Sequence, residues 1–464
     1  MAEQQTLIEE LLERIAAMEA EIQRLKAENA ELRHRLEMNS QNSHKPPSSD
    51  GYRKKTVRPA MPKPEKRAPG GKPGHKGKTL RQVEEPDKVH VHLPEACSVC
   101  GRAISVEEKH TILGKRQVFD LPEPKLEVCE HRLGQVECCG QTQCGQYPAY
   151  VRASVQYGPG VRALVTKLSV EHKMPLEQIS SLFSDMYRYE LNSETVEAAL
   201  EQGYCLAGPL EASVVEQLKK AEVTHFDETG LRVAGKLQWL HTAGNALYTS
   251  LFVHAKRGKE AMLSEKSVLK DFTGRAIHDC LASYFEFSGA KHGLCNAHLV
   301  RELQALMEEK SQWAELMRTF LLELHRQTQS QPLDGQAAEM ARQRYHQILL
   351  QADMEEPPPE TKTGKGRPKN TPGRNLLRRL RQHEEAVLAF AFVEGVPFTN
   401  NLAERDLRPA KVKQKVSGCF RTLQGAEVYA RLQAIIATCR KQDRNVFAFL
   451  RDLFAYQPLS LLAG

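Results

Sequence analysis

"VTHFDETGLRV", residues 223–233, sets the architecture of the whole chain. Apolar and aromatic residues lead into two adjacent acids, Asp227 and Glu228, and Thr229 and Gly230 follow. The pattern predicts a buried strand that ends at the acids, with a turn through Thr229 and Gly230. Carboxylates at the end of a strand either cap a turn or bind a metal ion, and a metal ion would need further ligands elsewhere in the chain.

The residues that follow predict a mixed sheet. Three strand-like runs separated by turn residues indicate an antiparallel meander: EVTHFD, LQWLHTAGN and ALYTSLFVHA. Downstream, GKEAMLSEKSVLKDF predicts a helix, GRAIHD a strand, ASYFEF a helix or turn, and KHGLCNAHLVRELQAL a strand that enters a helix. The order βββαβαβα is typical of a mixed α/β sheet, in which we expect the first and fourth strands to be neighbours.

Two further acids suit a metal site shared with Asp227. Asp279 ends the fourth predicted strand, and Glu404 lies in the late stretch TNNLAERDLRP beside Arg405 and Arg408. Hard cations prefer oxygen ligands, and phosphoryl transfer with two Mg²⁺ ions needs several carboxylates close together. We therefore interpret these three acids as candidate metal ligands.

Each of the three acids also has a purely structural interpretation. Asp227 could be a turn residue and Asp279 the N-cap of a following helix. Glu404 could belong to a capping box begun by Asn401. Their joint occurrence at two strand ends and on an Arg-flanked helix favours the metal interpretation.

The cysteines between residues 85 and 150 predict a small zinc-binding module. CSVCGR places Cys97 and Cys100 in a CxxC-Gly knuckle, the commonest half of a tetrahedral Zn²⁺ site. The other half should lie in ECCGQTQCGQ, where we favour Cys139 and Cys144, with Cys138 as an alternative. The competing interpretation is a set of reduced structural cysteines without a metal.

Residues 6–36 carry a heptad repeat that predicts a parallel two-stranded coiled coil. Apolar residues and one Asn recur at position a and apolar residues at position d: Ile8, Ile15, Ile22 and Asn29 at a, and Leu11, Met18, Leu25 and Leu32 at d. The alternative is a single amphipathic helix that packs on the body of the protein.

Residues 45–81 are rich in Lys, Arg, Pro and Gly and include Lys54, Lys55, Lys72 and Lys76. Such a composition cannot bury a core, so we expect an extended basic arm that binds DNA phosphates. The alternative is a solvated linker.

Helices are predicted on both sides of the sheet segment. Residues 155–220 have apolar positions at helical spacing, with a capped helix that begins at Ser193 and either a helix-turn-helix or a plain bundle. After residue 310 we expect a charged helical stretch, a basic loop and the helices that follow it.

Composition limits the classes of protein that fit this chain. It has 464 residues, a net charge of +7 and eleven cysteines. No apolar run approaches the roughly 20 residues of a membrane helix, and the acidic start lacks the pattern of a signal peptide. We expect a cytoplasmic, nucleoid-associated protein without a membrane partner, whose cysteines bind metal or stay reduced.

Several stretches, in this order, resemble the IS66 family of transposases: NSQNSHKPPSSDG, GGKPGHKG, HFDETGLRV, HDCLASYFEF, HGLCNAHLVREL, NNLAERDLRPAKVKQKVSGCFRT and GAEVYARLQAIIATCRKQ. The likeness covers almost the whole chain. It departs from the family where Leu231 and Leu281 replace a frequent Trp and where the second cysteine cluster is irregular.

The resemblance implies a multidomain α/β protein whose parts follow one another along the chain. They are a coiled-coil zipper (1–40), a basic arm (41–84), a zinc module (85–150), a helical DNA-binding region (151–220), an RNase H-like catalytic core (221–310 and 396–440) with a helical insertion (311–395), and a C-terminal tail (441–464).

The resemblance also implies a DDE active site. By motif, the triad is Asp227, Asp279 and Glu404, which hold two Mg²⁺ ions, or Mn²⁺, while Glu228 is no ligand. Zn²⁺ is a structural ion, and Arg405 and Arg408 join the arm lysines in binding DNA.

For Cys295 and His298 of the CNAH stretch we expect a satisfied buried pair, with a metal or DNA contact as the alternative.

The implied function is cleavage of the element's DNA ends and joining of their 3′-OH groups to target DNA. The protein is expected to act as a homodimer or higher oligomer, with the element's small accessory proteins as further partners. The competing functions are an RNase H-like nuclease or resolvase that cuts without joining, and a dimeric DNA-binding repressor.

Overall fold

The computed structural model describes residues 80–107, 109–358 and 370–462, together with eight residues near the start of the chain. It divides into two compact units, one formed by Met1–Tyr52 and Cys129–Gly464 and the other by Arg53–Val128. The predicted arm residues Lys54, Lys55, Lys72 and Lys76 lie outside the described residues, as does most of the heptad region.

The eight described residues of the heptad region are all helical. Four of them are apolar heptad residues whose surfaces are about half exposed: Ile15, Met18, Ile22 and Leu25. An exposed apolar stripe on a helix suits a partner helix, although the coiled coil itself stays a prediction.

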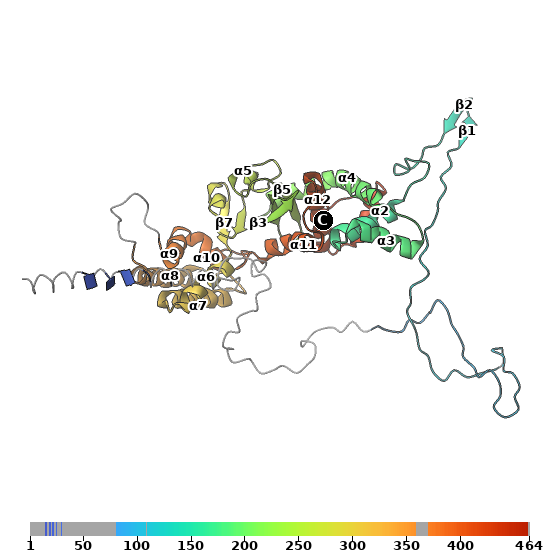
Figure 1. Cartoon of the computed structure of the whole chain (residues 1–464), viewed down its shortest axis with the longest axis horizontal. Helices are drawn as coiled ribbons and strands as arrows, with labels where there is room; N and C mark the ends of the chain where they lie inside the picture. Colours follow the sequence, from blue (N-terminus) through green and yellow to red (C-terminus); the bar gives the residue numbers. More distant parts are fainter. Residues whose placement is uncertain are drawn as a thin grey trace, which may run out of the picture. The chain divides into compact units, whose positions relative to one another are not determined.

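A five-stranded mixed sheet forms the centre of the larger unit (Figure 1). Its strands lie in the order β5-β4-β3-β6-β7, with bounds Val223–Val233 (β3), Lys236–Gly244 (β4), Thr249–His254 (β5), Arg275–His278 (β6) and Lys291–Leu294 (β7). β3, β4 and β5 pair antiparallel, whereas β6 and β7 run parallel to β3. The predicted meander and the pairing of the first and fourth strands are therefore confirmed.

The predicted turn at Thr229 and Gly230 is wrong. β3 continues through both residues, which pair with Leu240 and Trp239 of β4. The chain reverses instead at Ala234 and Gly235, both of which have positive φ. Pairing with β4 keeps Gly230 extended, and Asp227 consequently lies in the middle of a long strand.

The long helix predicted between β5 and β6 is also wrong. The structure has only α5 (Lys259–Met262) and a 3₁₀ turn at Leu269–Asp271. Serine hydroxyls compete with helical hydrogen bonds here, because Ser264 Oγ donates to the Ala261 carbonyl and Ser267 Oγ accepts from Leu269 N–H. A further 3₁₀ helix, Ala282–Glu286, follows β6.

Helices that precede the sheet in sequence and helices that follow it together build the first core, on the β5 side of the sheet (Figure 1). They are α2 (Pro159–Thr166), with its π-helical continuation Lys167–Glu171, α4 (Ser193–Lys219), α11 (Asn401–Ser417), α12 (Leu423–Lys441) and α13 (Val446–Phe454). α3 (Leu176–Tyr187) packs on α4 outside this core. α12 packs on β5, α13 on α2, and α11 on β3 and β4.

Two details differ from the expectations for these helices. Asn192, rather than Ser193, is the N-cap of α4, and its side chain accepts from Thr195 N–H. The expected tail at 441–464 includes α13, whose Phe449, Leu450 and Phe454 are buried in the first core.

A second core lies on the β7 side (Figure 1), where α10 packs against β7. Its helices are α6 (Asn296–Glu308), α7 (Gln312–Gln327), α8 (Gly335–Glu355), α9 (Pro372–Gln382) and α10 (Glu384–Phe392). In the part of the chain that the structure describes, no helix has the length and apolar character needed to cross a membrane.

Candidate active site

Two of the predicted metal ligands meet where β6 ends beside β3. β6 pairs only with Val223–His225 of β3, so the ladder stops just before Asp227. Asp279 directly follows β6, and its carboxylate accepts from Leu281 N–H in a tight turn. Oxygen atoms of Asp227, Asp279 and Glu228 lie within 4.8 Å of one another. The sheet therefore gathers three carboxylates at one point.

Glu228 is engaged in a buried network. Its side chain is fully buried and accepts from Tyr284 Oη and Arg257 Nε, each at 2.7 Å. Arg257 also lies 3.7 Å from Asp279 and over the ring of Trp239. Each carboxylate oxygen of Glu228 thus accepts one hydrogen bond, an arrangement that supports the interpretation that Glu228 positions its neighbours.

Sequence reasoning missed Arg257 and Tyr284. Their roles depend on contacts with Glu228 across 29 and 56 residues of chain. The spacing of residues along the chain does not indicate contacts over such separations. The only available signal is that Arg257 follows the third predicted strand, close to where the acids are expected.

Asn400 fixes the start of α11, the helix that carries Glu404. It is almost fully buried, with Oδ1 2.8 Å from His225 Nδ1 and Nδ2 donating to the Phe226 carbonyl at 2.7 Å. Its backbone N–H donates to Cys295 Sγ. One side chain thus joins α11 to the part of β3 that immediately precedes Asp227.

The capping-box interpretation of Glu404 is wrong. The N-cap of α11 is Asn400 rather than Asn401, and no side chain caps this end. The Glu404 backbone N–H instead donates to the Asn400 carbonyl. Among the described residues, the Glu404 side chain therefore takes no part in a helix cap.

The acids strongly affect one another's titration. Burial raises the pKa of Asp227 well above its ordinary value, and the negative charges of Glu228, Asp279 and Glu404 raise it further. The pKa of Glu228 is also raised, first by burial and then by Asp279. A concentration of buried negative charge of this kind is relieved when a cation binds.

Glu404 approaches a different pair of side chains most closely. Its carboxylate lies within 4.8 Å of Cys295 Sγ and a ring nitrogen of His298. Burial lowers the pKa of His298, while Asp279 and Glu404 act to raise it. His298 is thus close enough to Asp279 and Glu404 to feel both negative charges. The expectation of a satisfied pair is wrong for this histidine, because its buried Nδ1 has no hydrogen-bond partner among the described residues.

Two further acids that are alternatives for the third position, Glu302 and Glu427, are paired with basic residues. Glu302 forms a two-pronged ion pair with Arg379. Glu427 binds Lys266 at 2.6 Å. Glu404 has no comparable ion pair in the described part of the chain, which supports its place as the third acid.

Arg405 and Arg408 project from the exposed side of α11. The opposite side of this helix buries Ala403, Leu407 and Ala410. Both guanidinium groups therefore lie next to Glu404 in sequence and face solvent, where DNA phosphates could reach them.

The predicted zinc ligands form two local turns. The Cys97 carbonyl accepts from Gly101 N–H, as in a metal knuckle, and hydrogen bonds from the Cys100 and Val99 backbone lower the pKa of Cys97. β1 (Gln135–Cys138) and β2 (Gln141–Cys144) form a hairpin whose turn contains Cys139. Cys97 and Cys100 belong to the smaller unit and Cys139 and Cys144 to the larger one, so the joint zinc site stays a prediction.

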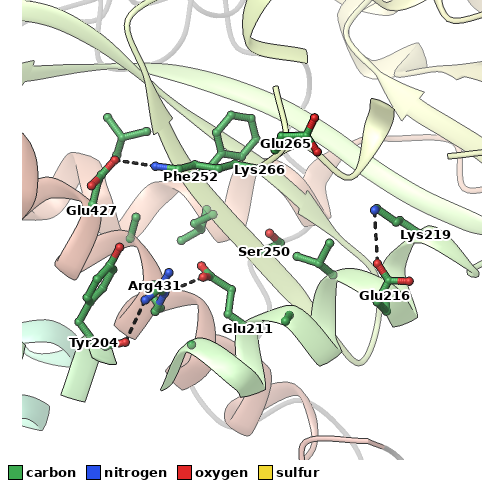
Figure 2. Close-up of a pocket in the computed structure, with 16 residues that line it drawn as sticks. Tyr204, Glu211, Glu216, Lys219, Ser250, Phe252, Glu265, Lys266, Glu427 and Arg431 are labelled. Carbon is green, nitrogen blue, oxygen red and sulfur yellow. Dashed lines mark hydrogen bonds and ion pairs between the residues drawn. The ribbon is translucent and has the colours of Figure 1, made fainter. Parts of the chain in front are cut away.

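A cavity of about 410 Å³ lies between α4, β5 and α12 and contains no member of the triad (Figure 2). Arg431 stacks on Tyr204 and pairs with Glu211, and Lys266 pairs with Glu427. Its charged groups thus pair largely with one another, and its arrangement supports no separate ligand.

The donor atoms of the acid site suit Mg²⁺ or Mn²⁺. They are carboxylate oxygens, the ligands that hard cations prefer, and they include the strongly perturbed Asp227. Asp227 and Asp279 would hold the ions, and Glu404 would complete the set from α11.

Comparison with known proteins gives two family matches. Residues 154–428 match a family model described as "Transposase IS66 family", a range that includes the sheet, the second core and the three acids and ends within α12. Residues 1–81 match a family of unknown function, DUF6444. No curated protein matches the chain.

Proposed function

Because the chain belongs to the IS66 family of transposases, we propose that it is a DDE enzyme that cuts the ends of its own element and joins them to target DNA. Family membership implies binding to DNA and use of divalent metal ions. The finer proposal is that Asp227, Asp279 and Glu404 form the catalytic triad.

One observation carries this proposal. Asp227 on β3 and Asp279 after β6 meet where two parallel strands separate, and Asn400 holds the helix of Glu404 against the same part of β3. Three acids from distant parts of the sequence thereby share one neighbourhood. The strand order and directions of the sheet support an RNase H-like core.

The bound ions would activate the attacking oxygen and stabilise the leaving oxygen. Asp227 and Asp279 would fix the position of the scissile phosphate, and Arg257 would hold the Asp279 carboxylate in place. Arg405 and Arg408 would bind the flanking phosphates from the exposed side of α11.

The chemistry proceeds in two displacements at phosphorus. Water attacks the phosphodiester at the transposon end, the bond to the 3′ oxygen breaks, and that oxygen leaves as a 3′-OH. The 3′-OH then attacks a phosphodiester of the target, so a new P–O bond forms while a target strand is released. Neither step needs a covalent protein intermediate, so no Ser or Tyr nucleophile should be essential.

The other parts of the chain supply binding and assembly in this proposal. The basic arm and the helical region 151–220 bind DNA, the zipper forms a homodimer, and Cys97, Cys100, Cys139 and Cys144 hold a structural Zn²⁺. α3 and α4, joined by a short turn at Arg188, suit either a helix-turn-helix or a bundle.

The test is a cleavage and strand-transfer assay with the element's own ends. Asp227→Asn, Asp279→Asn and Glu404→Gln should each lower both rates by on the order of 10²- to 10³-fold or more, because each weakens electrostatic stabilisation of the reacting phosphate. Binding to the ends should remain. Glu427→Gln is the matched control, because Glu427 is ion-paired away from the triad, and this variant should stay active.

The same assay separates the competing functions. Cleaved ends without joined product would identify a nuclease or resolvase. Binding without cleavage in the wild-type chain would identify a repressor. Full activity of Glu404→Gln alone would move the third ligand to another acid, with Glu302 tested next.

A further inference from the structure

A thiol, an imidazole and a carboxylate converge beside the acid site. Cys295 is the N-cap residue of α6, and His298 lies in the first turn of the same helix. Glu404 approaches from α11, and the three possible ligand atoms lie within 4.8 Å of one another. The chain thus places sulfur, nitrogen and oxygen donors around one point.

The thiol of this cluster is held firmly. Cys295 is buried with only 1% of its surface exposed, and its Sγ accepts the Asn400 backbone N–H at 3.1 Å. The residue that joins α11 to β3 therefore also fixes the position of this sulfur. A preset ligand reduces the ordering needed when an ion binds.

The imidazole has an unused ligand atom. His298 Nδ1 is buried without a hydrogen-bond partner among the described residues, although buried polar atoms in proteins are nearly always paired. His298 also faces Asp279, Glu302 and Arg301 electrostatically. An imidazole nitrogen left unpaired in such polar surroundings is suited to bind a cation.

We propose that Cys295, His298 and Glu404 form a second metal site, selective for a borderline-soft cation of the Zn²⁺ class, with its fourth position open to water. Thiolate and imidazole favour Zn²⁺ over Mg²⁺, whereas the oxygen-only set at Asp227 and Asp279 has the opposite preference. Ligand atoms of a tetrahedral zinc ion lie about 3.3 to 3.7 Å apart, so closure requires side-chain movements of only about 1 Å.

Because the second metal site and the proposed Mg²⁺ site share Glu404, a Zn²⁺ ion bound at the second site would inhibit strand transfer. This consequence rests on the proposed function. A Zn²⁺ ion at Cys295 and His298 engages the Glu404 carboxylate and withdraws it from the Mg²⁺ set. The chain then binds DNA ends but lacks its third catalytic acid. Zinc availability would thereby control strand transfer.

The metal site is tested by titration with Co²⁺, which reports thiolate ligation through an intense near-ultraviolet charge-transfer band. The full-length chain carries Cys97→Ser and Cys139→Ser, so that the predicted zinc module contributes little to the spectrum. We expect one equivalent of Co²⁺ to bind with this band. In the same background, Cys295→Ser should abolish the band, and His298→Ala should keep it while weakening affinity by about 10- to 100-fold.

Cys439→Ser is the matched control, because Cys439 is equally buried but lies on α12, outside the cluster. It should bind Co²⁺ like the background protein. A background protein without the band, or Cys295→Ser with an unchanged band, would overturn the site. His298→Ala retains the thiol, so unchanged affinity in that variant would overturn it even where Cys295→Ser fails to fold.

The inhibitory role is tested separately by the ratio of strand-transfer rates with and without added Zn²⁺ at constant Mg²⁺. This ratio should fall at least tenfold for the unsubstituted chain and for Cys439→Ser, and much less for His298→Ala. If the ratio for His298→Ala equalled that for the unsubstituted chain, the proposed competition of Zn²⁺ for Glu404 would be overturned. A chain inactive with Mg²⁺ alone would instead refute the proposed function, and the Co²⁺ spectrum would still decide the metal site.

Discussion

Asp227, a member of the proposed triad, illustrates at the residue scale how a buried acid stores unfavourable energy in the fold. Its carboxylate is buried beside Glu228 and Asp279, and its pKa is raised by burial first and by these charges second. Ionising it in the metal-free protein therefore costs stability, which a bound cation restores. Its position therefore costs stability when the carboxylate is ionised, as expected for the metal ligand that we propose.

Asp227→Asn should stabilise the metal-free protein by about 1 kcal/mol, a typical gain when a strained functional group is neutralised. A raised pKa means that the folded state binds more protons, so wild-type stability falls as pH rises through that pKa. The advantage of the Asn variant should grow over the same interval and shrink when Mg²⁺ is added. Urea unfolding at several pH values measures this.

Asp271→Asn is the control for that experiment, because Asp271 is half exposed and pairs with Lys219. It should change stability by less than about 0.5 kcal/mol, as surface substitutions usually do. Equal stabilisation by both variants would contradict a special environment for Asp227.

At the scale of elements, the site depends on one buried amide between α11 and β3. Asn400 satisfies His225 and the Phe226 carbonyl, both of which lie inside the protein. Without it, two buried groups lose their partners at once. The position of Glu404 relative to Asp227 therefore depends on Asn400, although Asn400 is not itself a proposed metal ligand.

Asn400→Ala should destabilise the protein by about 2 to 4 kcal/mol, because unpaired buried polar groups cost about 1 to 3 kcal/mol each. Strand transfer should fall more than end binding, because the start of α11 is released. Thermal unfolding and the joining assay measure the two effects. Asn401→Ala, at the exposed neighbouring position, should alter neither.

The cysteine turns give a second prediction at this scale. Cys97→Ser should lower the zinc content by about one equivalent per chain, because structural zinc needs a complete ligand set. Elemental analysis of freshly purified protein measures this. Cys205→Ser, an exposed cysteine on α4, should leave the zinc content unchanged. Equal zinc in the Cys97 variant would exclude this residue as a ligand.

The sequence predicted the sheet better than the site around it. Apolar runs, a pattern local to each strand, predicted the strands of the meander. The order of strands and helices then predicted the pairing of β3 with β6. The length of β3 was mispredicted, because pairing with β4 overrides the turn preference of Gly230. The contacts of Asn400 and Arg257 could not be predicted, because they join residues far apart in the chain.

At the scale of the whole molecule, the chain separates chemistry from assembly. The sheet and the second core lie within the region matched by the transposase family model, the first core extends beyond it through α12 and α13, and the heptads and the arm precede it. The described heptad residues expose Ile15, Met18, Ile22 and Leu25 to solvent in the single chain. Burial of this stripe therefore needs a second chain or another surface.

Deletion of residues 1–40 should give a monomer that still folds, because a zipper packs mainly on itself. Analytical ultracentrifugation should show the loss of the dimer, and the unfolding midpoint of the remainder should change little. An Asn29→Leu variant of the full chain should form other oligomers in addition, since a lone Asn at position a selects the dimer. An unchanged dimer after the deletion would place the interface elsewhere.

In the proposed site, Asn400 and Glu404 also determine when the triad becomes complete during synthesis of the chain. The last strand of the sheet ends at Leu294, but both residues emerge from the ribosome long afterwards, behind the helices of the second core. On this proposal, a nascent chain carries the predicted zipper and basic arm before its third acid has been synthesised. We expect chains that stop before residue 400 to occupy DNA without cutting it, so incomplete synthesis would produce inhibitors of the finished enzyme.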